Sequence, residues 1–239
     1  MDPLAISAAS GMRSRMQSLD MLANNLANAQ TGGYKSDREF YNLYLGEQAS
    51  PDGSTLPVIE RPWTDFSQGS LTPTGNALDL GLTGKGFFAV EGPGGPLYTR
   101  NGSFRLSPSG VLETAEGYAV RTVAGGHLQA GSAGALEVSA DGAVSQAGQP
   151  LGQLAVVDFA DTRTLSKQGT SYFHTAQASR PAAAIQVRQG ALENSNVGVA
   201  ESAVRLVDVM RQFEMLQKAA TLGSQMNRQV IEDVARVAT

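Results

Sequence analysis

The chain has 239 residues, enough for one large or two small domains with a sizeable core. Its net charge of −4 and the lack of any basic block argue against nucleic acid as a partner, and the absence of cysteine excludes disulfides and thiolate chemistry. No apolar run reaches about 18 residues, the length of a membrane span, so we expect no membrane insertion.

The first predicted element is a helix at the start of the chain. Its apolar residues recur three or four positions apart, or at multiples of that step: Leu4, Ala8, Met12, Leu19, Leu22 and Leu26. Asp2 suits the cap and Pro3 the first helical position, and Gly32-Gly33 suits the end of the helix, near Asn28. The pattern covers roughly 35 Å of helix. Residues 1–4 lack the basic and apolar regions of a cleaved signal, so we expect any export to leave the chain uncut.

Residues 31–77 are expected to form an irregular bridge, because Pro51, Pro57, Pro62 and Pro73 interrupt the segment. Its aromatic residues indicate that it packs against another part of the protein. The run 37–45 fits a helix or a strand equally well.

From residue 78 to 190 the pattern becomes that of short strands separated by glycine turns. It predicts an antiparallel all-β domain, either an irregular sandwich or a barrel. We expect strands at Leu80–Leu82, Phe87–Val90, Leu154–Phe159 and Ala183–Val187. The dipeptide Asn101-Gly102 predicts a hairpin over Leu97–Leu106.

A second and longer helical pattern ends the chain, after the capping residues Asn194, Ser195 and Asn196. Its apolar positions are Val199, Ala203, Leu206, Met210, Phe213, Leu216, Ala220, Met226, Val230, Val234 and Val237. It spans roughly 58 Å, so the first helix is too short to cover it. A helix with one apolar stripe needs a partner for that stripe, and the surplus predicts self-assembly.

The polar face of this last helix carries opposite charges four residues apart: Glu201 and Arg205, Glu214 and Lys218, Glu232 and Arg236. Each such pair contributes only about 0.2–0.5 kcal/mol. Their main expected effect is to keep that face in water.

The sequence gives no sign of a catalytic, cofactor or metal site. His127 and His174 have no metal-ligand spacing, and no serine or threonine lies in the context of an activated nucleophile. Gly81, Gly84 and Gly86 are followed by a predicted strand, whereas a phosphate loop needs a helix there. Scattered carboxylates leave a cell-wall hydrolase as a remote alternative, but we expect no enzyme.

Three asparagines, Asn24, Asn25 and Asn28, lie within about one turn of the first helix. Asparagine is unfavourable in an ordinary surface helix because its amide competes with the backbone. We therefore expect these amides to bond neighbouring backbones in a closely packed assembly.

Four ordered stretches support one family resemblance: Ala23–Lys35, Thr74–Phe88, Tyr98–Tyr118 and Gln189–Val197. They resemble the motifs of the bacterial flagellar basal-body rod and hook protein family. The stretch Arg211–Met215 is more similar to the proximal rod subunit than to the distal one, which remains the alternative. Residues 36–70 and 121–152 match only loosely.

The resemblance implies a structural subunit of the flagellar rod. Such a subunit is exported by the flagellar type III apparatus without a cleaved signal. In the periplasm it joins copies of itself and other rod or hook subunits in a hollow shaft that transmits motor torque. A non-flagellar β-rich adhesin or glycan-binding module is the remote alternative of another class.

The expected fold is α+β, with the terminal helices pairing as a coiled-coil-like domain and a central all-β domain outside it. The domains are 1–30 plus 197–239 for helical assembly, 31–77 for the bridge, and 78–190 for the β domain. The expected assembly interface comprises Leu4, Ala8, Met12, Leu19, Leu22, Asn24, Asn25, Leu26, Asn28, Leu206, Met210, Phe213, Leu216, Met226 and Val230. If Phe213 is fully buried, its replacement by Ala should cost about 3–5 kcal/mol.

Overall fold

A computed structural model of the chain describes residues 3–44, 56–131 and 134–237. It contains two compact units, which are treated separately below. The helical unit comprises Met1–Ala27, Asp37–Trp63 and Gly198–Thr239. The β unit comprises Asn28–Ser36 and Thr64–Val197.

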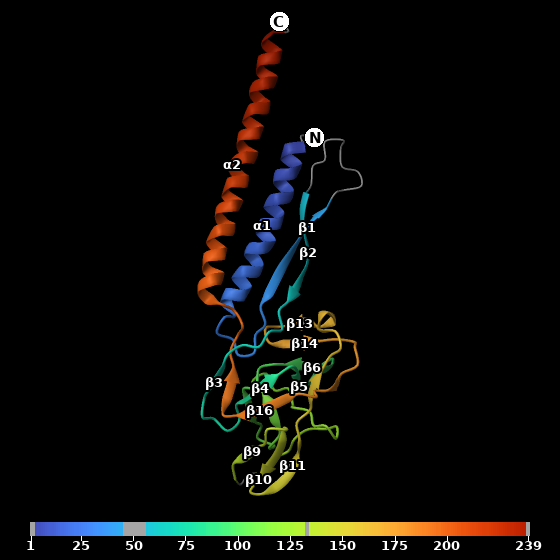
Figure 1. The fold of residues 1–239 in the computed structure, drawn as a ribbon. Coiled ribbons are helices and arrows are strands. Elements are labelled where there is room, and N and C mark those ends of the chain that lie inside the picture. Colours follow the sequence, from blue (N-terminus) through green and yellow to red (C-terminus); the bar gives the residue numbers. More distant parts are fainter. Residues whose placement is uncertain (1–2, 45–55, 132–133, 238–239) are drawn as a thin grey trace. The chain divides into compact units, whose positions relative to one another are not determined.

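Two long helices dominate the helical unit, as the periodicity predicts. Helix α1 runs over Pro3–Ala27 and α2 over Val199–Val237, which correspond to about 37 Å and 58 Å of helix. They lie side by side and run in opposite directions (Figure 1). Strands β1 (Asp37–Tyr44) and β2 (Leu56–Thr64) form a two-stranded sheet in the same unit. Neither helix, over its described residues, has the length and apolarity that crossing a bilayer requires.

The facing sides of the two helices differ in side-chain size. Buried positions of α1 recur three or four residues apart and are mostly small or polar: Ala8, Gly11, Ser14, Ser18, Leu22 and Asn25. On α2 the corresponding side carries larger apolar side chains, with Val209 buried and Leu206 half-buried. At Gly11 the approach is closest, because a Cβ built there would lie 3.3 Å from the Leu216 Cδ1 atom. The absence of a side chain at Gly11 therefore lets the helices pack closely.

The β unit is built from short antiparallel strands. They are β3 (Leu71–Pro73), β4 (Leu80–Gly84), β5 (Phe87–Gly92), β6 (Gly95–Thr99), β7 (Phe104–Leu106), β8 (Leu112–Thr114), β9 (Leu136–Val138), β10 (Ala143–Gln146), β11 (Gln149–Gln153), β12 (Val156–Asp158), β13 (Ser166–Gln168), β14 (Tyr172–His174), β15 (Arg180–Pro181), β16 (Ile185–Gln189) and β17 (Ala191–Glu193), with a short 3₁₀ helix at Thr162–Thr164.

Six of these strands form one central sheet with the order β13-β14-β6-β5-β12-β15. A second sheet has the order β11-β10-β9, and the pairs β16-β4, β17-β3 and β7-β8 complete the unit. Within the described residues these sheets do not close into a barrel, so the barrel alternative is wrong. The frequent glycine turns keep the strands short, and the sheets therefore remain small and separate.

Two apolar clusters form the core of the β unit. The larger one gathers inward-facing residues such as Leu82, Phe88 and Leu128 from several of the small sheets. The other is aromatic: Phe87 contacts Phe173 edge-to-face at 5.6 Å between ring centroids, and Tyr98 contacts Phe159 at 4.7 Å. Edge-to-face contacts of this kind add stability beyond the area they bury.

The predicted hairpin at Asn101-Gly102 is wrong. Strand β6 pairs with β5 and β14, whereas β7 pairs with β8, so the two arms of the turn enter different sheets. Gly102 explains the divergence, because its carbonyl accepts a hydrogen bond from the Leu80 N–H at 2.9 Å. A Cβ there would lie 1.7 Å from the Leu80 oxygen, so this close approach requires glycine.

Other strand predictions hold with shifted ends. The run 37–45, which fitted helix or strand, is strand β1. The strand expected at 154–159 is the shorter β12, and the one expected at 183–187 is β16, displaced by two residues.

One ion pair of α2 differs from the expected helical pairing. Arg205 pairs with Glu39 of β1, at 3.1 Å, in place of the expected helical partner Glu201.

Candidate functional site

Three buried charged side chains meet in the β unit. Glu193 Oε1 accepts hydrogen bonds from Lys35 Nζ at 2.5 Å and from the Gly69 N–H at 2.9 Å, and its Oε2 accepts one from Arg100 Nη1 at 3.1 Å. The side chains of Glu193 and Lys35 are fully inaccessible to solvent. Lys35 Nζ also donates to the Ser67 carbonyl at 2.7 Å. We call Lys35, Arg100 and Glu193 the buried charge cluster.

The buried charge cluster sets two cations against one carboxylate. Burial lowers the pKa of Lys35 and of Arg100, because it penalises their charged forms, and the Glu193 carboxylate opposes that effect. Arg100 gains two further contacts: its Nη2 donates to the Gly84 carbonyl at 2.6 Å, and its guanidinium lies 5.4 Å from the centre of the Phe87 ring. Both cations therefore depend on Glu193 for their counter-charge.

Backbone and amide hydrogen bonds surround the buried charge cluster. The Gly33 N–H donates to the Glu193 carbonyl at 2.7 Å, and the Ser36 N–H donates to Asn196 Oδ1 at 2.8 Å. Asn196 Nδ2 in turn donates to the Asp65 carbonyl at 2.8 Å. Gly33 has a φ of +67°, and a Cβ there would lie 2.3 Å from the Asn101 nitrogen, so only glycine fits.

These bonded segments are the ones through which the chain enters and leaves the β unit. The chain passes between the two units after residues 27, 36, 63 and 197. The segments next to these crossings, 28–36, 64–69 and 193–197, are bonded to one another through the buried charge cluster and Asn196. The cluster therefore ties together the ends of the β unit from which the chain continues to α1, β1, β2 and α2.

The buried charge cluster is not predicted from the sequence. Lys35, Arg100 and Glu193 each lie inside a recognised motif, but nothing in the chain shows that they meet. A single charged residue within a motif does not identify a partner 158 residues away.

A second polar network lies in the helical unit. Glu39 of β1 accepts hydrogen bonds from the Ser18 hydroxyl of α1 and from Arg205 Nη2 of α2, the latter at 3.1 Å. Ser18 is fully buried and the Glu39 side chain is nearly so. One carboxylate therefore joins both helices to the first strand.

The asparagines of α1 have separate positions. Asn25 is buried and bonds the β1 backbone twice, as a donor to the Asp37 carbonyl at 2.7 Å and as an acceptor from the Asp37 N–H at 2.9 Å. Asn24 is exposed, and Asn28 Oδ1 accepts a hydrogen bond from the Thr31 hydroxyl at 3.2 Å. The expected amide-to-backbone bond thus occurs at Asn25, with the strand of the same chain.

Replacing Asn25 with Ala should lower the free energy of unfolding of the helical unit by about 1–3 kcal/mol, because it leaves the part-buried N–H and C=O of Asp37 without these partners. Urea unfolding followed by circular dichroism in the helix band measures this loss. The control Gln17→Ala removes an exposed amide from the same helix and should cost at most about 0.5 kcal/mol. Equal losses for the two variants would contradict the role given to Asn25.

The expected interface residues divide into covered and uncovered sets. On α1, Ala8 and Leu22 are buried and Met12, Leu19 and Leu26 are half-buried, while the Leu4 side chain lies outside the described residues. On α2, Leu206, Phe213 and Leu216 are half-buried, and Met210, Met226 and Val230 are exposed. Because Phe213 is only half-buried, the cost of about 3–5 kcal/mol for its replacement by Ala does not apply to one isolated chain.

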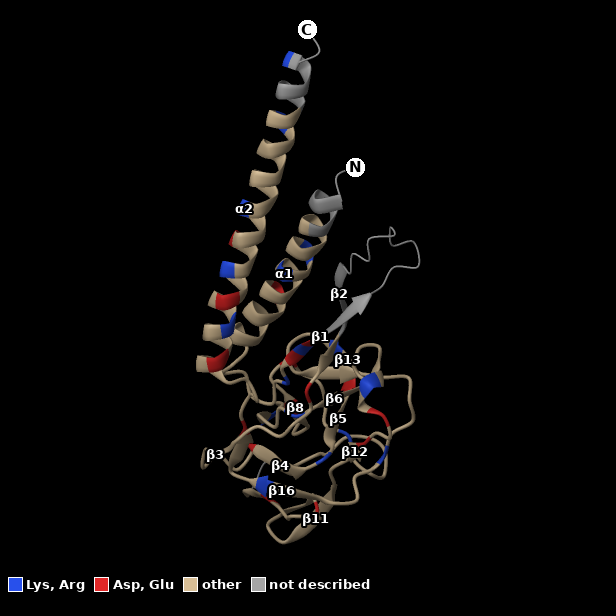
Figure 2. Ribbon diagram, turned by 45° about the horizontal axis from the view of Figure 1, so that its top comes forward, with Lys and Arg blue, Asp and Glu red and all other residues tan. Residues whose placement is uncertain are grey.

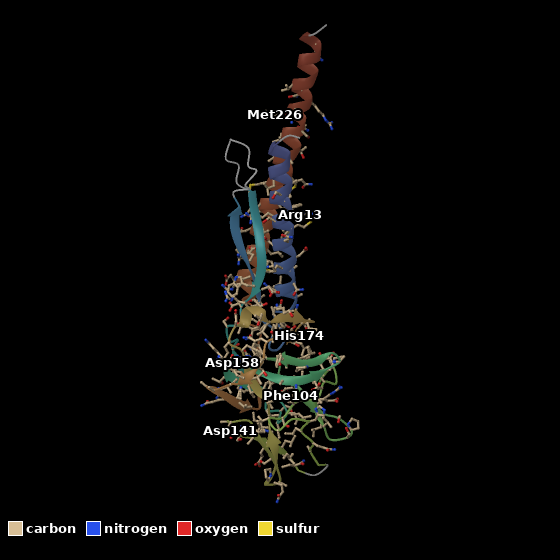
Figure 3. All side chains as sticks on the ribbon, turned by 90° about the vertical axis from the view of Figure 1, so that its right-hand side faces the viewer. Arg13, Phe104, Asp141, Asp158, His174 and Met226 are labelled. Atoms are coloured by element: carbon tan, nitrogen blue, oxygen red, sulfur yellow. The ribbon has the colours of Figure 1, made fainter. Side chains whose placement is uncertain are left out.

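The exposed residues include the end of α2 that has no α1 beside it. Gly11 lies opposite Leu216, and the first residue of α1, Pro3, lies eight positions before Gly11. Because the helices run in opposite directions, Pro3 lies opposite about residue 224 of α2, and α1 does not reach the residues beyond it. Met226 lies on the part of α2 that extends past α1 (Figures 1 and 3). One chain therefore leaves part of its predicted apolar surface uncovered.

Three family models match successive parts of the chain. A flagellar basal body rod protein model matches residues 7–35, the FlgE/F/G hook protein D1 domain matches 81–146, and the FlgEFG rod protein C-terminal model matches 188–232. Each of these segments contributes one member of the buried charge cluster: Lys35, Arg100 and Glu193 respectively.

Curated relatives match nearly the whole chain. It is 34% identical to the flagellar basal-body rod protein FlgF of Caulobacter vibrioides, over 92% of both chains. It is 32% identical to FlgF of Rhizobium meliloti, over 82% of this chain and 83% of that protein. It is also 27% identical to the rod protein FlgG of Bacillus subtilis, over 94% of this chain and 96% of that protein.

Proposed function

Because the chain belongs to the flagellar basal-body rod protein family and is a structural rod subunit, we propose that it polymerises through its helical unit into the hollow, torque-transmitting shaft. The observation that carries this proposal is the uncovered apolar surface of α2. Met215, Leu222 and Met226 are 62%, 59% and 65% exposed, and contiguous apolar surface of this kind is typical of protein–protein contacts.

In this proposal α1 and α2, paired in a coiled-coil-like manner, form an assembly domain that spans 1–30 and 197–239. Residues 31–77 are the bridge, and 78–190 are the β domain outside the tube. Full ordering of the helix ends accompanies addition of the subunit, since burial of the exposed apolar residues then offsets the entropy lost. Leu4, Asn24, Met210, Phe213, Met226 and Val230 belong to the proposed interface together with the covered residues of the two helices.

The buried charge cluster supports transmission of torque. A load that reaches the β unit along any of its chain connections meets the same hydrogen-bonded segments, 28–36, 64–69 and 193–197. These segments are joined in a buried site, where charged hydrogen bonds hold a single geometry. The segments from which the chain continues toward the helices are thereby held to one another within the β unit.

The finer assignment is to the proximal rod, on the basis of the stretch Arg211–Met215, with the distal rod as the alternative. We include in the proposal a periplasmic position in the basal body, export through the flagellar type III apparatus without cleavage, and other rod or hook subunits as partners. Relatives named FlgF and FlgG are both described as basal-body rod proteins, which supports the rod position under either assignment.

Isolated basal bodies test the proposal directly. The chain should be present in the rod fraction at its full mass, and cells that lack its gene should be non-motile with incomplete rods. An epitope in the β unit, located by immunogold labelling, should lie near the motor end for a proximal subunit and near the hook end for a distal one. Complete rods and normal swimming without the chain would refute the rod function.

A further inference from the structure

A groove in the helical unit lies between α1 and the β1–β2 sheet. It has a volume of about 370 Å³ and is lined by Gln17, Asp20, Met21, Asn24, Asp37 and Pro62. We call it the acidic groove. Its α1 residues lie at positions i, i+3, i+4 and i+7 from Gln17 and therefore form one face of that helix. Met21 and Pro62 give it an apolar surface, and Asp20 and Asp37 give it two carboxylates.

The outer side of α2 carries a pattern that fits such a groove. Its residues Arg211, Met215, Lys218, Leu222 and Met226 are spaced four, three, four and four positions apart and are all exposed. We call them the outer stripe. Arg211, Met215, Lys218 and Leu222 lie more than a quarter turn around the helix from Leu206, Val209 and Leu216, which face α1. Met226 lies about 80° from Leu216, on the part of α2 that extends past α1. The outer stripe is thus apolar with two cations and is not covered by α1.

Within the part of the chain that the structure describes, the acidic residues near the outer stripe do not form an ion pair with its lysine, Lys218. Figure 2 shows acidic and basic residues interspersed along the first half of α2, and Asp208 and Glu214 are the acids closest to the outer stripe. Among the described residues, no ion pair is recorded between Lys218 and Glu214 or any other acid. Lys218 therefore offers an unpaired cation between the exposed side chains of Met215 and Leu222.

We propose that the outer stripe of α2 in one copy of the chain docks in the acidic groove of a second copy. Met215 and Leu222 then cover Met21 and Pro62, while Lys218 and Arg211 face Asp20 and Asp37. Within one chain the two surfaces cannot meet, because the outer stripe points away from the α1 that forms the groove. This inference rests on the proposed rod function and specifies which surfaces join.

The proposed contact is heterologous, since it joins two different surfaces. A contact of this kind leaves one free groove and one free stripe at the ends of every assembly, so it extends a polymer instead of closing a dimer. An apolar helix face in a groove supplies the affinity, and the complementary charges fix the register and speed the encounter.

A charge exchange tests the pairing in the full-length chain. Asp20→Lys and Lys218→Glu should each weaken self-association about tenfold, measured by sedimentation velocity, because each places like charges together. The double variant Asp20→Lys, Lys218→Glu should regain most of the affinity. Two controls should leave association unchanged: Arg228→Glu, about 80° around α2 from Lys218, and Glu137→Lys, in the β unit.

The outcomes separate this inference from the rod function. Single variants that associate normally, or a double variant no better than either single one, would overturn the pairing, as would a wild-type chain that does not associate with itself. The same variants in cells provide a second measurement by swimming. If wild-type chain is present in rods but the exchange fails, only the docking is wrong; if it is absent from rods, the rod function itself fails.

Discussion

Replacing Glu193 with Ala is expected to lower the free energy of unfolding of the β unit by about 3–5 kcal/mol. The substitution leaves the buried Lys35 ammonium and Arg100 guanidinium without a counter-charge, and the Gly69 N–H without an acceptor. Such a loss is a large share of the stability of a domain of this size. Thermal and urea unfolding followed by near-ultraviolet circular dichroism measure it.

Two variants show whether the charge or only the bulk of Glu193 matters. Glu193→Gln keeps the shape of the side chain but removes its charge, so it should be almost as destabilised as Glu193→Ala. The matched control Glu113→Gln breaks an ion pair with Arg105, whose side chain is more than half exposed, and should cost at most about 1 kcal/mol. A Glu193→Gln variant as stable as the control would show that the buried charge cluster is not held by its carboxylate.

The opposite substitution has a smaller expected effect. Lys35→Met removes a cation whose pKa is already lowered by burial, and Arg100 remains to pair with Glu193. Removing the carboxylate should therefore cost more than removing either cation. This order of losses follows from two cations sharing one acid.

The helices could be predicted closely from the sequence, because their signal is local. Apolar residues three or four positions apart located α1 and α2, and the capping residues placed their ends within a few positions. The pattern does not specify how much of a stripe one neighbour covers. Val209, the most buried apolar residue among the described side chains of α2, was therefore missed, while Met226 and Val230 were included although one chain leaves them exposed.

The sheets and the buried charge cluster could not be predicted, because their contacts are not local. Asn101-Gly102 has the composition of a hairpin turn, but the close approach of Gly102 to Leu80 sends its arms into different sheets. Lys35 and Glu193 are in contact although 158 residues separate them in the sequence. The order of the motifs identifies these segments as family features. Only the fold shows that their charged side chains bond to one another.

Replacing Phe213 with Asp is expected to abolish rod incorporation and swimming. Phe213 lies half-buried on the side of α2 that faces α1, and a carboxylate there loses hydration without gaining a partner. The β unit should remain folded, because its core residues belong to other elements. Soft-agar swimming and the amount of chain in isolated basal bodies measure the effect.

The control for this variant places the same charge four residues along α2. Gln217 is exposed, so Gln217→Asp should change stability by only about 0.5 kcal/mol and leave swimming intact. Normal swimming of the Phe213→Asp strain would remove Phe213 from the interface. A Phe213→Asp chain with a disrupted β unit would show that the two units do not fold independently, and the loss of swimming would then reflect folding, not assembly. An intact β unit in a chain absent from rods is the result that assigns assembly to the helices, since it separates the part that must polymerise from the part that must only hold its shape.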